Sequence, residues 1–378
     1  MEKTEKKVEY IELIYDLIFV YMIGRNNSLL GNIVDGFVPY QTFLAYVMCT
    51  LAVIQIWNFS TYYINLYGRN SLRNYIFLLF NMFMLYSMGV GTTLHWEEYR
   101  VRYHIAWGLI ILNCVVQYIF ELRKYKDDPA ERRGIRRAIF VLAGEAVLIG
   151  ISTFFEGLTG IALSGVAIAF GIVFSRISGR VSHLNVDFMH LSERAMLYVV
   201  FTFGEMIIAI VTYFDDELSV TSFYMALMAF LIVVGLFLSY GIIYDKITDR
   251  EMKTDGLNYM LIHVFLIFGL NNTTVSLEFM HEEEVSLLPK IIALVVSLMI
   301  YYICLFLLKR YAKKSCVPGR TFNLELLLIL IIYAALMIIL RNYMVINITV
   351  TAACVFLIFI LLYSFVKKMD RCPVPWAK

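Results

Sequence analysis

Long runs of hydrophobic residues, separated by short charged segments, follow one another along the whole chain. A helix needs roughly 20 mostly apolar residues to cross the hydrocarbon layer of a bilayer, and the sequence offers twelve such runs. They cover residues 8–30, 40–65, 74–94, 103–121, 137–155, 159–178, 193–213, 220–243, 257–278, 289–309, 322–341 and 345–366. The runs are too long and too uniformly apolar for the strands of a barrel. The pattern predicts an all-α, polytopic membrane bundle of about twelve transmembrane helices.

Composition supports a membrane location. Of the 378 residues, 60% are hydrophobic and 16% are charged, which leaves too little polar surface for a water-soluble fold. The connections between the runs are short, so there is no room for a separate soluble domain. Any chemistry must therefore take place within the bundle or at its ends.

Lys and Arg are distributed unevenly between the two sides of the predicted bundle. Cytoplasmic segments of membrane proteins are rich in both residues. With the N-terminus inside, the inner segments hold 27 of the 32 basic residues, and acidic residues gather in outer segments such as 215–217 and 282–284. The chain is therefore predicted to lie in the cell membrane with both termini in the cytoplasm. Topology and anionic lipid headgroups explain the basic loops better than nucleic acid does.

A weak internal repeat is found when the chain is compared with itself at an offset near 185 residues. The first run then matches the seventh, and the third matches the ninth. Six helices per unit would make the two halves parallel repeats about an axis along the membrane normal. The interpretation is a 6+6 bundle with halves 1–180 and 181–378. The alternative is that any two six-helix stretches with similar basic loops resemble each other at some offset.

Charged residues within the apolar runs are the candidates for function, because a charge at membrane depth is costly. In the first run Glu9, Glu12 and Asp16 lie at i, i+3 and i+7, on one face of a helix. At 1.5 Å per residue, Asp16 lies roughly 12 Å below the helix start, too deep for a surface charge. Glu9 is interpreted as an interfacial acid at a helix N-terminus.

The seventh run and its approach carry a second charged stripe, formed by His190, Arg194 and Glu205, with Glu193 on the adjacent face. We expect the first and seventh helices to face each other, with Arg194 near Glu12 and Asp16 and with Glu205 further in. Such a cluster could relay protons or bind substrate, or it could be a static ion-pair lock.

Two further residues within the runs are weaker candidates. Glu145 is a mid-helix carboxyl group of the fifth run, without a counterpart in the other half. His263 is equally consistent with a neutral, hydrogen-bonded core histidine. The zinc, phosphate-loop and nucleophile-elbow motifs are absent from the sequence. No catalytic residue, metal or cofactor is therefore predicted.

Two segments resemble the signatures of the bacterial low-temperature-requirement A family. The first is Val8–Val20, which contains Val-Glu, an aromatic residue and Asp-Leu in the family's order. The second is His190–Arg194, followed by Gly204 and Glu205. The resemblance implies a multi-pass bacterial membrane protein, linked by name to growth in the cold. It marks these motif positions: Glu9, Asp16, Glu193, Arg194 and Glu205.

The leading hypothesis is a secondary transporter, in which protonation of a carboxyl group lets two halves reorient around a site for protons or an unidentified small solute. One alternative is a membrane sensor or receptor-like protein that holds a lipid or another apolar ligand. Another is an intramembrane enzyme that acts on a lipid with the carboxyl groups as acid and base. Membrane lipids are expected partners, nucleic acids are not, and the sequence leaves a homo-oligomer open.

Overall fold

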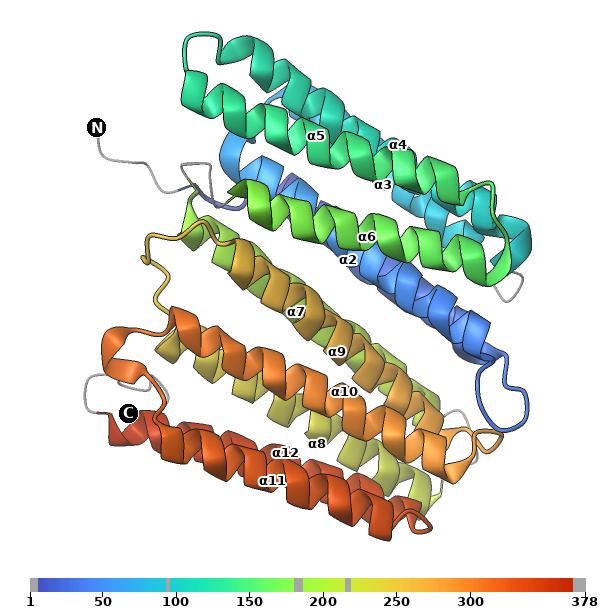
Figure 1. The fold of residues 1–378 in the computed structure, drawn as a ribbon. Helices are drawn as coiled ribbons and strands as arrows, with labels where there is room; N and C mark the ends of the chain where they lie inside the picture. Colours follow the sequence, from blue (N-terminus) through green and yellow to red (C-terminus); the bar gives the residue numbers. More distant parts are fainter. Residues whose placement is uncertain (1–5, 93–95, 180–185, 215–218, 370–378) are drawn as a thin grey trace. The chain divides into compact units, whose positions relative to one another are not determined.

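The computed structural model describes residues 6–92, 96–179, 186–214 and 219–369, which form twelve α-helices (Figure 1). The helices are α1 (Tyr10–Asn27), α2 (Tyr40–Tyr67), α3 (Leu72–Gly91), α4 (Trp96–Lys124), α5 (Pro129–Ser152), α6 (Gly157–Gly179), α7 (Phe188–Ala209), α8 (Val220–Ile242), α9 (Leu257–His281), α10 (Leu287–Leu307), α11 (Arg320–Ile339) and α12 (Met344–Lys368). Short 3₁₀ segments or a π turn follow several of them: η1 (Ser28–Gly31), η2 (Ile210–Phe214), η3 (Ile243–Ile247), η4 (Leu308–Tyr311) and η5 (Lys314–Cys316). Each predicted run overlaps one α-helix, which confirms the all-α fold.

Several helices begin at residues that can cap them. The hydroxyl of Ser71 accepts a hydrogen bond from the backbone N–H of Asn74 (3.4 Å) at the start of α3. Asp128 caps α5 by accepting two backbone N–H groups at 3.0 Å, and Pro129 occupies the first turn. Ser219 caps α8 in the same manner. These side chains satisfy N–H groups that a helix leaves unpaired at its start.

The helices form two compact units, and the first contains Met1–Tyr198 and Lys253–Val264. In this unit α4 packs against α3 and α5, and α6 packs against α5 and α2 (Figure 1). Helix α1 contacts both α2 and α3. Gly256, just before α9, has a φ of +66°, and a β-carbon there would lie 2.4 Å from Leu191 Cδ2. Glycine is therefore required where the chain turns into α9 beside α7.

The second unit contains Val199–Met252 and Phe265–Lys378. Here α12 packs against α8 and α11, and α10 contacts α11. The segments that follow η3 and η4 are joined by backbone hydrogen bonds, including Asp249 N to Tyr311 O at 2.7 Å and Lys313 N to Ile247 O at 2.8 Å. The predicted 6+6 repeat, with its boundary at residue 180, stays a prediction.

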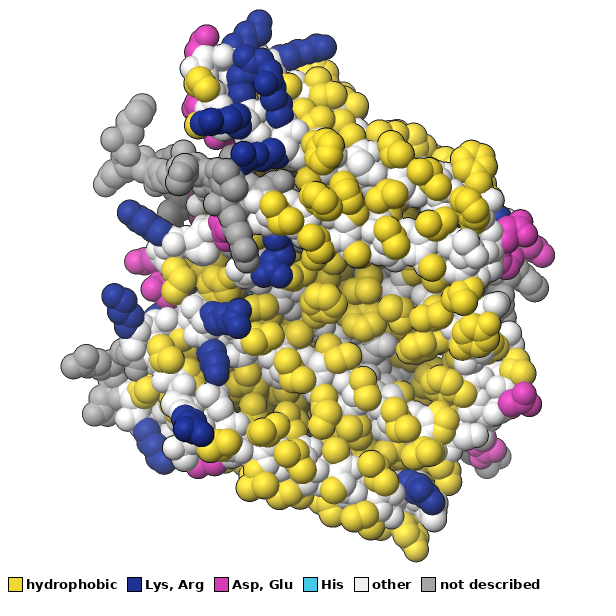
Figure 2. Space-filling view, in the orientation of Figure 1, with side chains coloured by type: hydrophobic (Ala, Val, Ile, Leu, Met, Phe, Trp, Pro, Cys, Tyr) yellow, Lys and Arg dark blue, Asp and Glu magenta, His cyan; other side chains and the backbone are white. Residues whose placement is uncertain are grey.

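Eight helices of the described chain are long and apolar enough to span a membrane: α2, α4, α6, α8, α9, α10, α11 and α12. Helix α1 is not among them, because Glu12, Asp16 and Arg25 fall within its 18 residues. The number of twelve crossings therefore stays a prediction. On the face shown in Figure 2, apolar side chains cover the flanks of the helices in each unit, and Lys and Arg side chains gather at one end of each unit. This arrangement suits a multi-pass membrane protein.

Candidate functional site

The acidic face of α1 points into the first unit. Glu9 precedes the helix as its N-terminal flanking residue and is half-buried. One and two turns further on, Glu12 keeps 4% of its surface exposed and Asp16 none. The opposite face, with Tyr10, Ile14 and others, is exposed and apolar. The helix therefore buries its acids and presents hydrophobic side chains outward, as expected where the surroundings are lipid.

Arg194 of α7 binds both buried acids of α1. Its Nε lies 3.3 Å from Oδ2 of Asp16, and its Nη2 donates to Oδ1 of the same carboxylate. The guanidinium therefore forms a bidentate interaction with Asp16, through two hydrogen bonds. The remaining nitrogen, Nη1, lies 3.3 Å from Oε2 of Glu12. The indole N–H of Trp57 in α2 also donates to Asp16, at 2.9 Å. Paired hydrogen bonds of this kind are strong and fix orientation, so Asp16 and Arg194 form a rigid pair.

His190, one turn before Arg194, also binds Glu12, with Nε2 3.3 Å from Oε2. Its other nitrogen, Nδ1, lies 3.1 Å from the side-chain nitrogen of Asn65. The amide orientation of Asn65 is fixed, because its oxygen accepts from the backbone N–H of Asp187 (3.1 Å) and a backbone N–H only donates. The nitrogen of Asn65 therefore donates to Nδ1, which leaves the ring proton on Nε2, the nitrogen that lies 3.3 Å from Oε2 of Glu12.

Glu12, Asp16, His190 and Arg194 together form what we call the ion-pair cluster. With His190 in this tautomer, the cluster holds two carboxyl groups and one guanidinium. Asp16 has both oxygens bound by Arg194, whereas Glu12 shares a single oxygen between Arg194 and His190. The less completely bound carboxyl group is therefore Glu12, and a proton or a cation would balance its charge.

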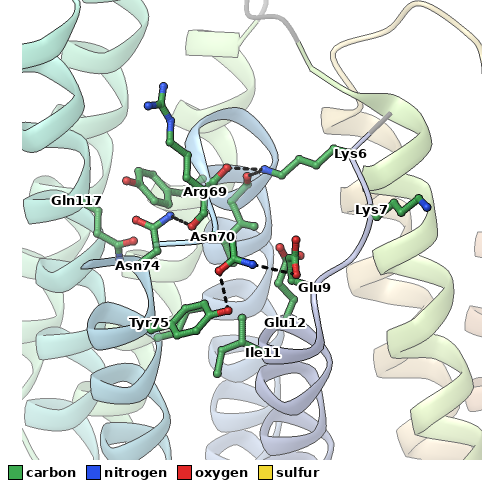
Figure 3. Close-up of a pocket in the computed structure, with 14 residues that line it drawn as sticks. Lys6, Lys7, Glu9, Ile11, Glu12, Arg69, Asn70, Asn74, Tyr75 and Gln117 are labelled. Carbon is green, nitrogen blue, oxygen red and sulfur yellow. Dashed lines mark hydrogen bonds between the residues drawn. The ribbon is translucent and has the colours of Figure 1, made fainter. Parts of the chain in front are cut away.

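A pocket of about 420 Å³ lies beside the cluster, at the end of the first unit where α1 begins (Figure 3). Its lining includes the amides of Asn70, Asn74 and Gln117 and the phenol of Tyr75. Glu12 belongs both to this lining and to the ion-pair cluster. Asp16 and Arg194 lie deeper and are fully buried. Within the cluster, Glu12 therefore borders the pocket, whereas Asp16 is buried away from it.

Lys6 holds the N-terminal segment against one side of this pocket. Its ammonium donates to backbone carbonyls at the end of α2, those of Ile64, Asn65 (3.5 Å) and Gly68 (3.1 Å). Burial lowers the pKa of Lys6, and Glu12 acts in the opposite direction by favouring the charged form. In Figure 3 the side chain of Lys6 reaches toward the end of α2, and the side chain of Lys7 extends in a different direction.

The structure thus brings together Glu12, Asp16, His190 and Arg194, four of the predicted site residues. Glu9 lies at the pocket, where Oε2 accepts from Asn70 at 3.4 Å. Glu193 is half-buried and does not take part in the cluster.

Three predicted residues lie elsewhere. Glu205 belongs to the second unit. Its predicted place beside Arg194 stays a prediction. His263 is buried, with Nδ1 2.9 Å from the carbonyl oxygen of Tyr259. Glu145 is buried between α2, α5 and α6 beside Gln55.

Sequence reasoning missed Lys6, Trp57 and Asn65, which hold the pocket and the cluster in place. An asparagine within an apolar run was a usable signal, because a buried amide needs partners. The described residues contain no group of three or more His, Cys, Asp and Glu side chains arranged to hold a metal ion.

The family model described as "Bacterial low temperature requirement A protein" matches residues 7–360. No curated protein and no solved structure matches the chain. The matched range covers the ion-pair cluster and most of the pocket lining.

Proposed function

The chain belongs to the bacterial low temperature requirement A family of membrane proteins, and we propose that it is a proton-coupled secondary transporter of a small polar solute. The observation that carries the proposal is that Glu12 belongs to both features of the site. It pairs with Arg194 and His190, and it also lines the pocket. A purely structural lock would have no need of an acid at a cavity. An intramembrane acid beside a cavity suits proton or solute binding.

Proton uptake at Glu12 would change both the cluster and the pocket. A neutral Glu12 no longer balances the charge of Arg194, so a solute that brings a negative charge into the pocket beside Glu12 is favoured. The amides of Asn70, Asn74 and Gln117 supply further hydrogen bonds. Solute binding and proton binding then favour one another, which is the thermodynamic basis of coupling.

The deeper pair has a different role in this proposal. Asp16 and Arg194 are fully buried, and Trp57 adds a third hydrogen bond to Asp16. This pair serves as the fixed anchor between α1 and α7, and Glu12 serves as the group that changes its protonation. The basic residues between α4 and α5 support a cytoplasmic position for the end of the bundle that carries the pocket.

The proposal is tested in proteoliposomes loaded with a pH-sensitive dye. A panel of amino acids, amines, carboxylic acids and sugars is added to wild-type protein, to Glu12→Gln and to the control Glu193→Gln, and proton movement is recorded. We expect a solute-dependent proton flux in the wild type and in Glu193→Gln, and background flux in Glu12→Gln. Equal fluxes in all three proteins would remove Glu12 from the coupling mechanism.

The competing hypotheses predict other results. A sensor or receptor-like protein would retain a tightly bound lipid or apolar ligand through purification and move no solute. An enzyme would convert a lipid substrate in the same vesicles. Mass spectrometry of the extracted lipids, before and after incubation, separates both from transport.

A further inference from the structure

A second buried acid lies in the first unit, outside the ion-pair cluster. Glu145 of α5 is completely buried. Its Oε2 lies 3.5 Å from the side-chain nitrogen of Gln55 in α2, a long hydrogen bond. The same nitrogen donates to the backbone carbonyl of Ile168 in α6, at 3.1 Å. Three helices therefore meet at one carboxyl group and one amide.

Gly171 of α6 makes the room that this pair occupies. A β-carbon at residue 171 would lie 2.0 Å from Oε2 of Glu145 and 2.4 Å from Nε2 of Gln55. Both distances are far shorter than any real contact, so a side chain at this position would displace the polar pair. The glycine is therefore part of the site and not merely a point of close helix packing.

The site lacks one hydrogen-bond donor. The amide nitrogen of Gln55 has two N–H groups, and these are directed at Glu145 and Ile168. Oε1 of Glu145 and Oε1 of Gln55 are both buried, and neither has a hydrogen-bond partner among the described residues. Buried polar atoms in folded proteins are nearly always paired. A donor is missing from the site, and a hydrogen atom on the carboxyl group would supply it.

No charged partner compensates Glu145. Among the described residues no Lys, Arg or His forms an ion pair with Glu145, whose side-chain partner is the amide of Gln55. The thiol of Cys114 in α4 is a titratable group within electrostatic range of it. From α2 the site receives the neutral amide of Gln55, and from α6 it receives Gly171 and a backbone carbonyl. A buried carboxylate without a cation is much less stable than the neutral acid.

We propose that Glu145, Gln55 and Gly171 form a proton-binding site, in which the Glu145 carboxyl group carries a proton and pairs with the Gln55 amide as a neutral acid–amide pair. The ligand is a single proton, bound within the membrane and separately from Glu12. Glu121 of α4 provides a contrast in the same unit. It is equally buried, but Arg73 lies 2.7 Å from its carboxylate, so Glu121 binds a cation where Glu145 binds a proton.

Infrared difference spectroscopy tests the proposal directly. The spectrum of Glu145→Gln is subtracted from that of the wild type at neutral pH, in the carbonyl region of protonated carboxylic acids. We expect one protonated-acid band to disappear in Glu145→Gln and no such band to disappear in Glu121→Gln. Loss of a carboxylate band in Glu145→Gln would overturn the proposal.

A second measurement uses the unmodified protein, in case Glu145→Gln fails to fold. Dicyclohexylcarbodiimide, which partitions into membranes, takes the carboxyl proton onto one nitrogen, adds the carboxylate oxygen to its central carbon, and rearranges to a stable N-acylurea. We expect mass spectrometry to find this adduct on the peptide that contains Glu145 and not on the peptide that contains Glu121. An adduct on Glu121 with none on Glu145 would contradict the proposal.

Discussion

Two carboxyl groups of α1 share one arginine, and the consequences for stability differ between them. Asp16 and Arg194 are fully buried. Removing one partner of a buried pair leaves the other charge uncompensated, which typically costs about 3–5 kcal/mol. We therefore expect Asp16→Asn and Arg194→Met each to lower the free energy of unfolding by that amount, measured by thermal unfolding in detergent.

The double variant Asp16→Asn/Arg194→Met provides the control. It removes both charges, so its loss of stability should be smaller than the sum of the two single losses. Additive losses would mean that the two side chains do not act as a pair. Glu12→Gln should cost less than either single variant at the deeper pair, because Glu12 borders the pocket and water can reach it.

Lys6 should make the stability of the protein depend on pH. Burial lowers its pKa in the folded protein below the ordinary value of 10.5. Between these two values the unfolded chain binds a proton that the folded protein does not, so folding is favoured more strongly as pH rises. We expect the wild type to gain stability relative to Lys6→Met as the pH is raised from neutral toward 10.5. A stability difference between the wild type and Lys6→Met that stays constant over this pH range would contradict the prediction.

At the scale of the helix, two of the glycines of α6, Gly165 and Gly171, offer a matched comparison. A β-carbon at Gly171 would overlap Glu145 and Gln55, whereas one at Gly165 would meet no atom within 4 Å. Gly171→Ala should therefore destabilise the protein by about 1–3 kcal/mol through overpacking. Gly165→Ala should be neutral or slightly stabilising, because alanine favours helix more than glycine does. Equal effects in thermal unfolding would show that Gly171 is not needed by the polar pair.

The helices themselves could be predicted from hydropathy, because every crossing of a lipid layer requires a long apolar run. The ends were less predictable. Helix α4 begins at Trp96 and α5 at Pro129, both earlier than the apolar runs, since capping and charged first turns extend helices beyond the lipid. The approach of α1 to α7 followed from charge, because buried acids at i and i+4 need a cation.

The partners from α2 could not be predicted in the same way. Gln55, Trp57 and Asn65 lie in a helix that is buried on most sides, so its polar positions do not define one face. Which of them meets Asp16 and which meets Glu145 depends on how the helices cross, and that is fixed by side-chain packing throughout the first unit. Lys6 was missed because it precedes the helix and binds backbone atoms, which carry no sequence signal.

For the molecule as a whole, the number of membrane crossings is the open structural prediction. Helix α1 carries three charged residues and is not among the eight helices suited to spanning by length and composition in the described chain. If α1 crosses the bilayer, residues 7 and 32 lie on opposite sides. In a cysteine-free background, Asn32→Cys should then react with an impermeant maleimide in intact cells, and Lys7→Cys should react only after the membrane is opened.

Two further positions calibrate that experiment. Under the predicted orientation, Glu284→Cys lies outside and Asp127→Cys lies inside, and both residues are exposed. Equal reactivity of Lys7→Cys and Asn32→Cys, with the two reference positions behaving as expected, would mean that α1 lies along one surface of the membrane. The pocket and the ion-pair cluster would then sit at the interface, and the twelve-span topology would be wrong.

The hydrogen bond from Trp57 to Asp16 also gives the protein an optical property. Indole absorption and emission respond to the electric field around the ring, and the field at Trp57 is set by the charges of the cluster within a few ångströms. Of the four tryptophans in the chain, Trp57 alone donates to the Asp16 carboxylate in the described structure. A protein that keeps this indole and carries phenylalanine at the other three positions would report a change of charge at Glu12 as a shift in its fluorescence, without an added label.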